Sequence, residues 1–150
     1  MISLVDIKAA RERIRDSVYL TPAPQSETLS RATSNALCLK LENLQMTGSF
    51  KERGALNRIL TLTPEERSHG VITASAGNHG QAVAYHASKR GIPAQICMPM
   101  HTPITKLNAV KNYGGEAVLV GQNYDEAMQE ARRREAAEHR TYLSAFDDED

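Results

Sequence analysis

Beyond Gly70 the sequence alternates regularly between two hydrophobic periods. Short apolar runs typical of strands occupy residues 71–74, 94–98, 117–120 and 141–144. Helical patterns fill the gaps between them, at residues 79–89, 104–112 and 124–138. Neighbouring parallel strands need a crossover connection of about this length, which is usually a helix. The order therefore predicts an α/β fold, in which a small parallel sheet has helices on both faces and forms three layers.

The first seventy residues follow a less regular pattern. Helices are expected at residues 4–18, 26–32, 54–62 and 64–69, and a strand is expected at residues 36–41. Ser3 and Asp6 have the spacing of a capping box for the first helix. The strand would place Leu37, Leu39 and Leu41 on one face.

Composition excludes several classes of protein. The chain of 150 residues has 18 basic and 18 acidic side chains, so it lacks the positive field that a nucleic-acid phosphate backbone needs. Neither a membrane-spanning run nor a secretory signal is found, and we expect no membrane partner and a cytoplasmic location. Cys38 and Cys97 lie far apart without a metal-ligand spacing, so we expect two buried, reduced thiols and no metal.

The loop Ser75-Ala-Gly-Asn-His-Gly-Gln81 joins a predicted strand to a predicted helix. Its small residues let the backbone approach a ligand, and the free N–H groups at the helix start attract an anion. In parallel sheets a ligand also sits beyond the carboxyl ends of the strands, where this loop lies. A tight turn that only starts the helix would explain the glycines equally well.

A second segment, Gly48-Ser-Phe-Lys-Glu-Arg-Gly54, places Lys51 in or near the first turn of a helix. The positive end of the helix dipole disfavours an ammonium group there, and Phe50 supplies an apolar surface that could desolvate the amine of Lys51. Neutral lysine amines form imines with carbonyl compounds. Most lysines are solvated surface charges, so this pattern alone leaves both interpretations open.

Together these segments resemble a known family. Ser49-Phe-Lys-Glu-Arg-Gly-Ala55 and Ser75-Ala-Gly-Asn-His-Gly-Gln81, preceded by Glu42-Asn-Leu-Gln-Met-Thr-Gly48, are similar to the pyridoxal-phosphate-dependent serine/threonine dehydratases of fold type II. The resemblance covers nearly the whole chain and is closest to the threonine dehydratase branch. It implies pyridoxal 5′-phosphate as cofactor, an amino-acid substrate and a homo-oligomer in the full-length parent protein.

The resemblance also implies roles for individual residues. Lys51 falls on the lysine that forms the imine with the cofactor, and Phe50 falls on the residue packed beside the cofactor ring. Asn78 falls on the side chain that hydrogen-bonds the ring's 3′ oxygen. The clamp for the substrate carboxylate would consist of Ser75, Ala76, Gly77, Asn78 and His79.

The implied reaction is an α,β-elimination. L-Threonine, and L-serine as a second substrate, would lose the β-hydroxyl and give a 2-oxo acid and ammonia, in isoleucine biosynthesis or threonine catabolism. Serine racemases and hydroxyaspartate dehydratases of the family carry serine where this chain has Ala76, which favours elimination from threonine over both. A non-enzymatic α/β module that binds an anion or a partner is the alternative from another class.

The family's domain division implies an incomplete protein. Residues 1–53 would belong to the larger domain, residues 54–146 would form the smaller α/β domain, and residues 147–150 are an acidic end. Family members continue into a glycine-rich loop for the cofactor phosphate, so we expect a truncated chain that catalyses poorly alone. The apolar face of the first segment would then lack its partners and be disordered or self-associate.

Two other side chains have open assignments. His86 falls on the inward face of its helix, so we expect a core histidine there. Arg53, two residues after Lys51, has three possible partners: Glu42, Glu52 or the substrate.

Overall fold

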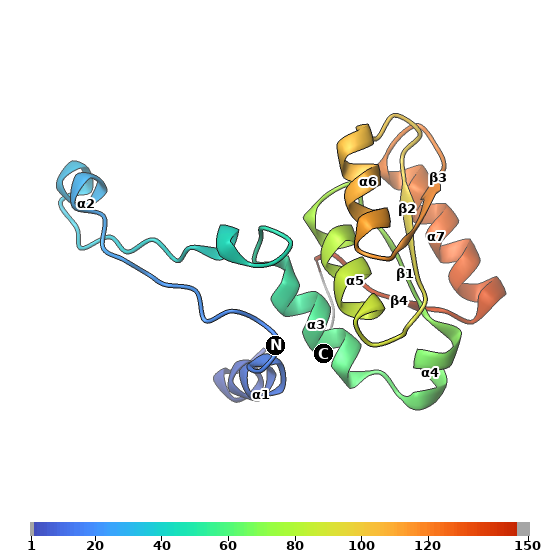
Figure 1. The fold of residues 1–150 in the computed structure, drawn as a ribbon, viewed down its shortest axis with the longest axis horizontal. Helices are drawn as coiled ribbons and strands as arrows, with labels where there is room; N and C mark the ends of the chain where they lie inside the picture. The colour runs from blue at the N-terminus through green and yellow to red at the C-terminus, as the bar shows by residue number, and fades with distance from the viewer. Residues whose placement is uncertain (1, 147–150) are drawn as a thin grey trace.

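The computed structural model describes residues 2–146 and contains a four-stranded parallel sheet (Figure 1). The strands are β1 (Val71–Ala74), β2 (Ala94–Met98), β3 (Glu116–Leu119) and β4 (Thr141–Tyr142), in the order β3-β2-β1-β4. In register, Val71 pairs with Ala94 on one side and Thr141 on the other. The predicted parallel sheet is confirmed, with β3 beginning one residue early and β4 two residues shorter than predicted.

Helices cover both faces of this sheet, which confirms the three layers (Figure 1). They are α3 (Lys51–Thr61), α5 (Asn78–Ser88) and α6 (Ile104–Asn112) on one face, and α7 (Tyr124–Glu138) on the other. Ala55, Ile59 and Val110 join the larger core on the first face. Ala127 and Ala131 of α7 are fully buried on the second face, where Met128 packs beside them.

The connections divide the sheet at one point. The crossovers through α5 and α6 lead from β1 to β2 and on to β3, whereas α7 leads back across the opposite face to β4. The crossover that leaves β1 and the crossover that enters β4 therefore lie on opposite faces of the sheet. Such a topological switch point opens a crevice at the carboxyl ends of the two strands.

An arm precedes the sheet and extends away from it (Figure 1). It consists of α1 (Leu4–Ile14), α2 (Glu27–Thr33) and a short 3₁₀ turn, Glu42–Leu44, while the small helix α4 (Pro64–His69) links α3 to β1. The predicted capping box is present, because Ser3 and Asp6 bond each other's backbone N–H groups. No helix among residues 2–146 combines the length and apolarity required to cross a bilayer.

The strand predicted at residues 36–41 is wrong. Only an isolated bridge forms, between Gln25 and Cys38. The backbone N–H groups of Leu39 and Leu41 donate to the carbonyl oxygens of Pro24 and Pro22 at 2.9 and 3.1 Å. Proline has no N–H to donate in return, so the pairing along this segment cannot become a regular ladder.

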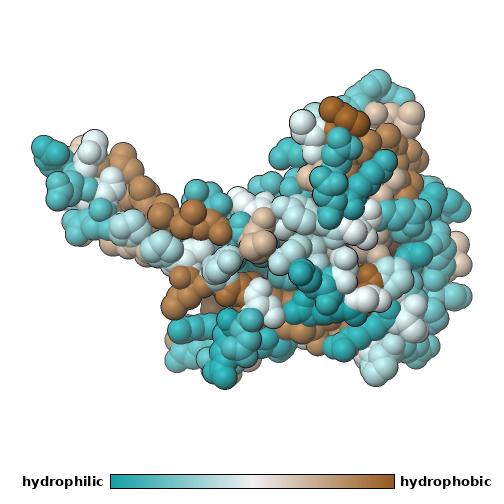
Figure 2. Space-filling view, in the orientation of Figure 1, coloured by the Kyte–Doolittle hydropathy of each residue, from teal (hydrophilic) through white to brown (hydrophobic). Residues whose placement is uncertain are grey.

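Apolar side chains on the arm face solvent. Leu39 is 40% exposed, Leu37 and Leu41 are half-buried, and brown apolar surface is visible along the arm in Figure 2. Cys38 is exposed, which corrects the prediction of two buried thiols, because its single bridge to Gln25 leaves the side chain uncovered. Cys97 is buried as predicted, and burial raises the pKa of its thiol to about 11. The acidic end predicted at residues 147–150 lies outside the described residues.

One ion pair fastens the arm to α3. Arg53 Nε and Nη2 donate to the two carboxylate oxygens of Glu42, each at 2.8 Å. Hydrogen bonding to Arg53 lowers the pKa of Glu42 from 4.5 to about 2. Because the pKa is lower in the folded chain, this pair stabilises the fold above pH 4.5, and the contribution disappears as the pH falls towards 2.

We therefore expect Glu42→Gln to lower the free energy of unfolding by about 1–3 kcal/mol at neutral pH. Urea unfolding of the wild type and the variant at a series of pH values measures the difference, which should shrink from pH 4.5 to pH 2. Glu27→Gln, at an exposed carboxylate of the same arm, should change stability by no more than about 0.5 kcal/mol. A difference that stays constant across this pH range would contradict the pairing.

Candidate active site

The switch point of the sheet brings three segments together. The loop at residues 75–77 leaves the carboxyl end of β1, and residues 143–146 leave the carboxyl end of β4. The first residue of α3 faces the second of these segments, because Lys51 Nζ donates a hydrogen bond to the backbone oxygen of Ala145. A ligand site of a parallel sheet is expected at this place.

Lys51 is the first residue of α3, as the sequence predicted, and its side chain is half-buried. Besides its hydrogen bond to Ala145, Nζ lies 5.6 Å from the ring centroid of Phe50 and 5.3 Å from that of Phe146. The amine is therefore held between two aromatic rings and a carbonyl oxygen. Both rings present large apolar surfaces to the pocket beside it.

That pocket has a volume of about 300 Å³. Its size is at the lower end of the range of small-molecule sites. The lining residues come from the start of α3, from α5 and from the segment after β4: Phe50, Lys51, Arg53, Gly54, Ala55, Asn57, His79, Ser144, Ala145 and Phe146. The primary amine of Lys51 thus lies in a pocket that is lined mostly by aromatic and small side chains.

The loop after β1 is shaped for close backbone approach. A Cβ added at Gly80 would lie 2.8 Å from Ile96 Cγ2 and 2.9 Å from the Ser75 oxygen, so α5 can pack against this loop only with glycine there. Among residues 2–146 no side chain caps α5, although side chains cap α1, α2, α4 and α7. The positive end of the helix dipole at the first turn of α5 favours an anion there.

His79 has a different orientation from the one expected of a ligand-binding side chain. Its ring is buried, and Nε2 lies 3.1 Å from Thr73 Oγ1 and 3.2 Å from the Leu143 oxygen. A carbonyl oxygen only accepts, and Thr73 Oγ1 already donates to it at 2.7 Å, so Nε2 must carry the proton. The ring thus ties β1 to the segment after β4, and its contribution to an anion site would come from its backbone N–H.

The predicted residues occupy two neighbouring parts of the site. Phe50, Lys51 and His79 line the pocket. Ser75, Ala76 and Gly77 form the loop, with Gly77 N donating to Ser75 Oγ at 3.2 Å, and Asn78 is exposed at the first position of α5. Sequence reasoning missed Ser144, Ala145 and Phe146, although the rule about carboxyl strand ends applies to β4 as much as to β1.

The two open assignments are resolved by the structure. Arg53 lines the pocket and donates hydrogen bonds to Glu42 and to the Tyr19 backbone oxygen. His86 is buried in the core on α5, as predicted, where its Nε2 lies 3.3 Å from Glu52 Oε2.

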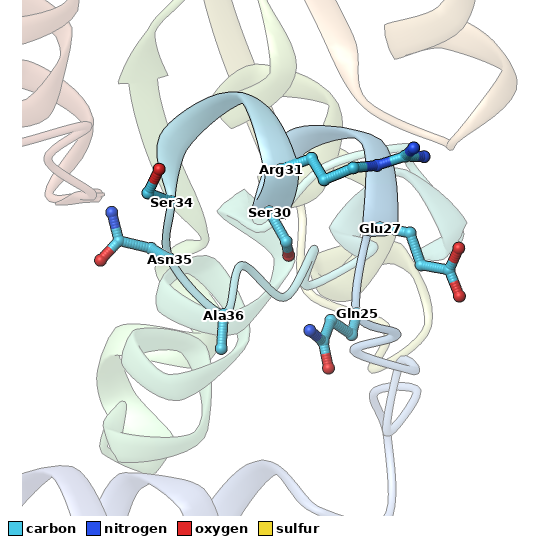
Figure 3. A pocket seen from close by; sticks show the side chains of 7 residues that line it. All are labelled: Gln25, Glu27, Ser30, Arg31, Ser34, Asn35 and Ala36. Carbon is cyan, nitrogen blue, oxygen red and sulfur yellow. The ribbon is translucent and has the colours of Figure 1, made fainter.

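A second, open pocket lies on the arm around α2, far from Lys51 in the fold (Figures 1 and 3). Its polar side chains do not converge. Arg31 and Glu27 point to one side, and Ser34 and Asn35 lie on the opposite side (Figure 3).

Comparisons with known proteins identify the family of the chain. The sequence pattern of a family described as "Pyridoxal-phosphate dependent enzyme" matches residues 14–150. The L-threonine ammonia-lyase of Thermotoga maritima is 44% identical over 148 residues, which are 99% of this chain and 37% of that protein. The chain spans less than half the length of the first curated relatives it matches.

Solved structures share the fold. The processed form of threonine deaminase isoform 2 from Solanum lycopersicum superposes with a TM-score of 0.89 at 40% identity, over 97% of this chain and 42% of that one. Serine racemase from Dictyostelium discoideum gives a TM-score of 0.90 at 35% identity, over 98% of this chain and 48% of that one. With the family pattern matching all but the first thirteen residues, the chain belongs to the pyridoxal-phosphate dependent enzymes.

Proposed function

We propose that this chain carries the amine and the carboxylate clamp of a lyase that converts L-threonine, and L-serine as a second substrate, to a 2-oxo acid and ammonia. The single observation that carries the proposal is the position of Lys51. Lys51 is the first residue of α3, and its amine lies between two aromatic rings. The amine faces the switch point of the sheet, where it donates to Ala145. Relatives named threonine ammonia-lyase and threonine deaminase support the choice of substrate.

The residues present fit pyridoxal phosphate. The pocket offers one primary amine with aromatic surface on either side of it, and the exposed Asn78 directly precedes the pocket residue His79 in the chain. When bound, the cofactor supplies an aldehyde for amines and a ring that withdraws electrons from the substrate's Cα. Lys51 would hold the aldehyde carbon, Phe50 would pack beside the ring, and Asn78 would donate to the ring oxygen.

Lys51 also serves as the base in this proposal. Its Nζ lies at the end of a flexible stem within the pocket, so after a substrate amine takes its place it remains within reach of the Cα proton. Its hydrogen bond to Ala145 and its contacts with the two rings hold the amine in place. The amine must leave these contacts to act as a nucleophile, which links reactivity to the segment after β4.

The loop after β1 is the proposed clamp for the substrate carboxylate. The backbone N–H groups of Asn78 and His79 open α5, where the helix dipole stabilises a negative charge. Ser75 and Gly77 keep the loop tight through their own hydrogen bond. Ala76 and the exposed Asn78 complete the clamp, and the buried ring of His79 holds it against the sheet.

Racemisation is the second candidate, because serine racemases are among the similar structures. It needs a proton donor on the face of Cα opposite the lysine. The side chain at position 76 is a methyl group, which cannot donate a proton. We therefore infer that elimination is the main reaction of this site.

The test loads the purified chain with pyridoxal phosphate, adds one amino acid at a time, and then reduces with borohydride. Addition of L-threonine should lower the amount of label trapped on Lys51 several-fold and yield a 2-oxo acid. D-Threonine should have neither effect. D-Serine formed from L-serine without a 2-oxo acid would favour the racemase instead. Label on Lys51 that no amino acid displaces would contradict the proposed function.

A further inference from the structure

The residue directly after Lys51 is a fully buried carboxylate. Glu52 has an exposed fraction of 0% and is the second residue of α3. Burying an ionised carboxylate is costly unless nearby donors and charges compensate for the lost water. The proposed reaction makes no use of this group, so its presence beside the reactive lysine calls for a separate explanation.

Two contacts compensate the buried charge. Glu52 Oε1 accepts a hydrogen bond from the backbone N–H of Thr47, and Oε2 lies 3.3 Å from His86 Nε2. Burial by itself would raise the pKa of Glu52, but the interactions with His86 and Thr47 outweigh it and hold the pKa below its usual value. Glu52 is therefore a carboxylate in the folded chain, and the His86 side chain beside it is equally buried.

These contacts join three segments that build the site. Thr47 lies in the turn that leads into α3, Glu52 lies on α3 next to Lys51, and His86 lies on α5, whose first residues form the proposed carboxylate clamp. The contact with His86 is close, but within residues 2–146 neither Oε2 nor Nε2 completes an aligned hydrogen bond. The attraction is therefore electrostatic and depends on the charge of Glu52.

Few other titratable groups surround the pair. The ring of Tyr85 on α5 lies 4.9 Å from that of His86, and Tyr113 packs against Tyr85 at 5.6 Å. From the arm, Asp16 and Tyr19 line a pocket that also contains Glu52 and Tyr85. Arg53 follows Glu52 in the chain but is paired with Glu42. The His86 ring is the basic side chain in contact with the Glu52 carboxylate, with Nε2 3.3 Å from Oε2.

We propose that Glu52 is a positioning residue for Lys51, which as a carboxylate locks the turn before α3 and the clamp helix α5 at fixed places around the amine. The inference deepens the proposed function, since it assumes that Lys51 is the reactive amine. Neutralising Glu52 releases α5 from α3 without removing any group that touches the cofactor. A small displacement of this kind lowers reaction rates by about tenfold to a hundredfold.

The test compares Glu52→Gln, His86→Gln and the double variant with the wild-type chain. Glutamine keeps the oxygen that Thr47 needs and loses only the charge that faces His86. Glu65→Gln is the matched control, because Glu65 is also the second residue of a helix but is exposed. Two measurements are made on each: the rate at which pyridoxal phosphate labels Lys51, trapped with borohydride, and hydrogen exchange across residues 45–52.

We expect each single variant to slow Lys51 labelling about tenfold or more, and the double variant to be no slower than the worse single one. Hydrogen exchange across residues 45–52 should become faster in the same variants, and the control should match the wild type in both measurements. Labelling at the wild-type rate in Glu52→Gln, or rate losses that multiply in the double variant, would overturn the proposal. Global unfolding of Glu52→Gln where the control stays folded would overturn it too, in favour of a purely structural role.

The two proposals fail differently in this experiment. If wild-type Lys51 takes up no label, the proposed function is wrong, and hydrogen exchange decides the positioning claim alone. Faster hydrogen exchange across residues 45–52 in both single variants then still supports the positioning role of Glu52, and unchanged exchange overturns it.

Discussion

Replacing Lys51 by arginine should abolish imine formation with pyridoxal phosphate. A guanidinium stays protonated and cannot act as a nucleophile, whereas a lysine amine can. Loss of the one primary amine in the described lining of the pocket should lower the rate of cofactor attachment by about a thousandfold or more. The visible absorption of the protein-bound cofactor, followed over time at equal protein concentration, measures the effect.

Lys106→Arg is the matched control for this variant. Lys106 is an exposed residue in the first turn of α6, so it shares the helix-start position with Lys51 but lies outside the pocket. Cofactor attachment at the wild-type rate is expected for Lys106→Arg. Equal losses in both variants, or attachment that survives in Lys51→Arg, would show that Lys51 is not the attachment site.

Ile59→Ala, a truncation on α3, should be strongly destabilising. Ile59 has an exposed fraction of 0% and packs in the core between α3, α5 and the sheet. Removing its side chain loses buried apolar area and leaves a cavity, which together cost about 2–5 kcal/mol. Urea unfolding followed by far-UV circular dichroism should therefore show a lower midpoint and little change in slope.

The same substitution at an exposed site separates packing from helix propensity. Ile104 on α6 is 63% exposed, so Ile104→Ala should change the free energy of unfolding by no more than about 0.5 kcal/mol. Because α3 carries Lys51 at its start, Ile59→Ala should also slow cofactor attachment at urea concentrations below the midpoint. Similar stability of the two variants would contradict the assignment of Ile59 to the core.

The regular half of the chain was predictable because local patterns and tertiary packing agree there. The boundaries of β1, β2, α6 and α7 match the predicted ranges, since the apolar positions that define each period are those that the sheet and helices bury. Lys51 at a helix start was predictable for a similar reason, because a glycine-flanked segment precedes a helical apolar pattern.

The arm was harder because its residues have few partners within residues 2–146. Residues 36–41 alternate like a strand, but their neighbours Pro22 and Pro24 cannot donate, and Leu39 remains exposed. The division of the chain at residues 53 and 54 stays a prediction. Local periodicity reports which side chains could share a face, and it does not report what covers that face.

Two parts of the site depend on long-range contacts that no local pattern contains. Lys51 donates to Ala145, ninety-four positions away, and His79 Nε2 reaches the Leu143 oxygen. The pairing of Glu52 with His86 is likewise a consequence of α3 packing against α5. Such contacts follow once the sheet order is known, because the order sets which strand ends and helices become neighbours.

The central claim is that these residues assemble a pyridoxal-phosphate site around Lys51. The most direct measurement incubates the wild-type chain with pyridoxal phosphate, reduces with borohydride and maps the label by peptide mass spectrometry. We expect close to one label per chain, on the peptide that contains Lys51, with little on the other lysines. Label scattered over Lys8, Lys89, Lys106 and Lys111 in proportion to their exposure would contradict the claim.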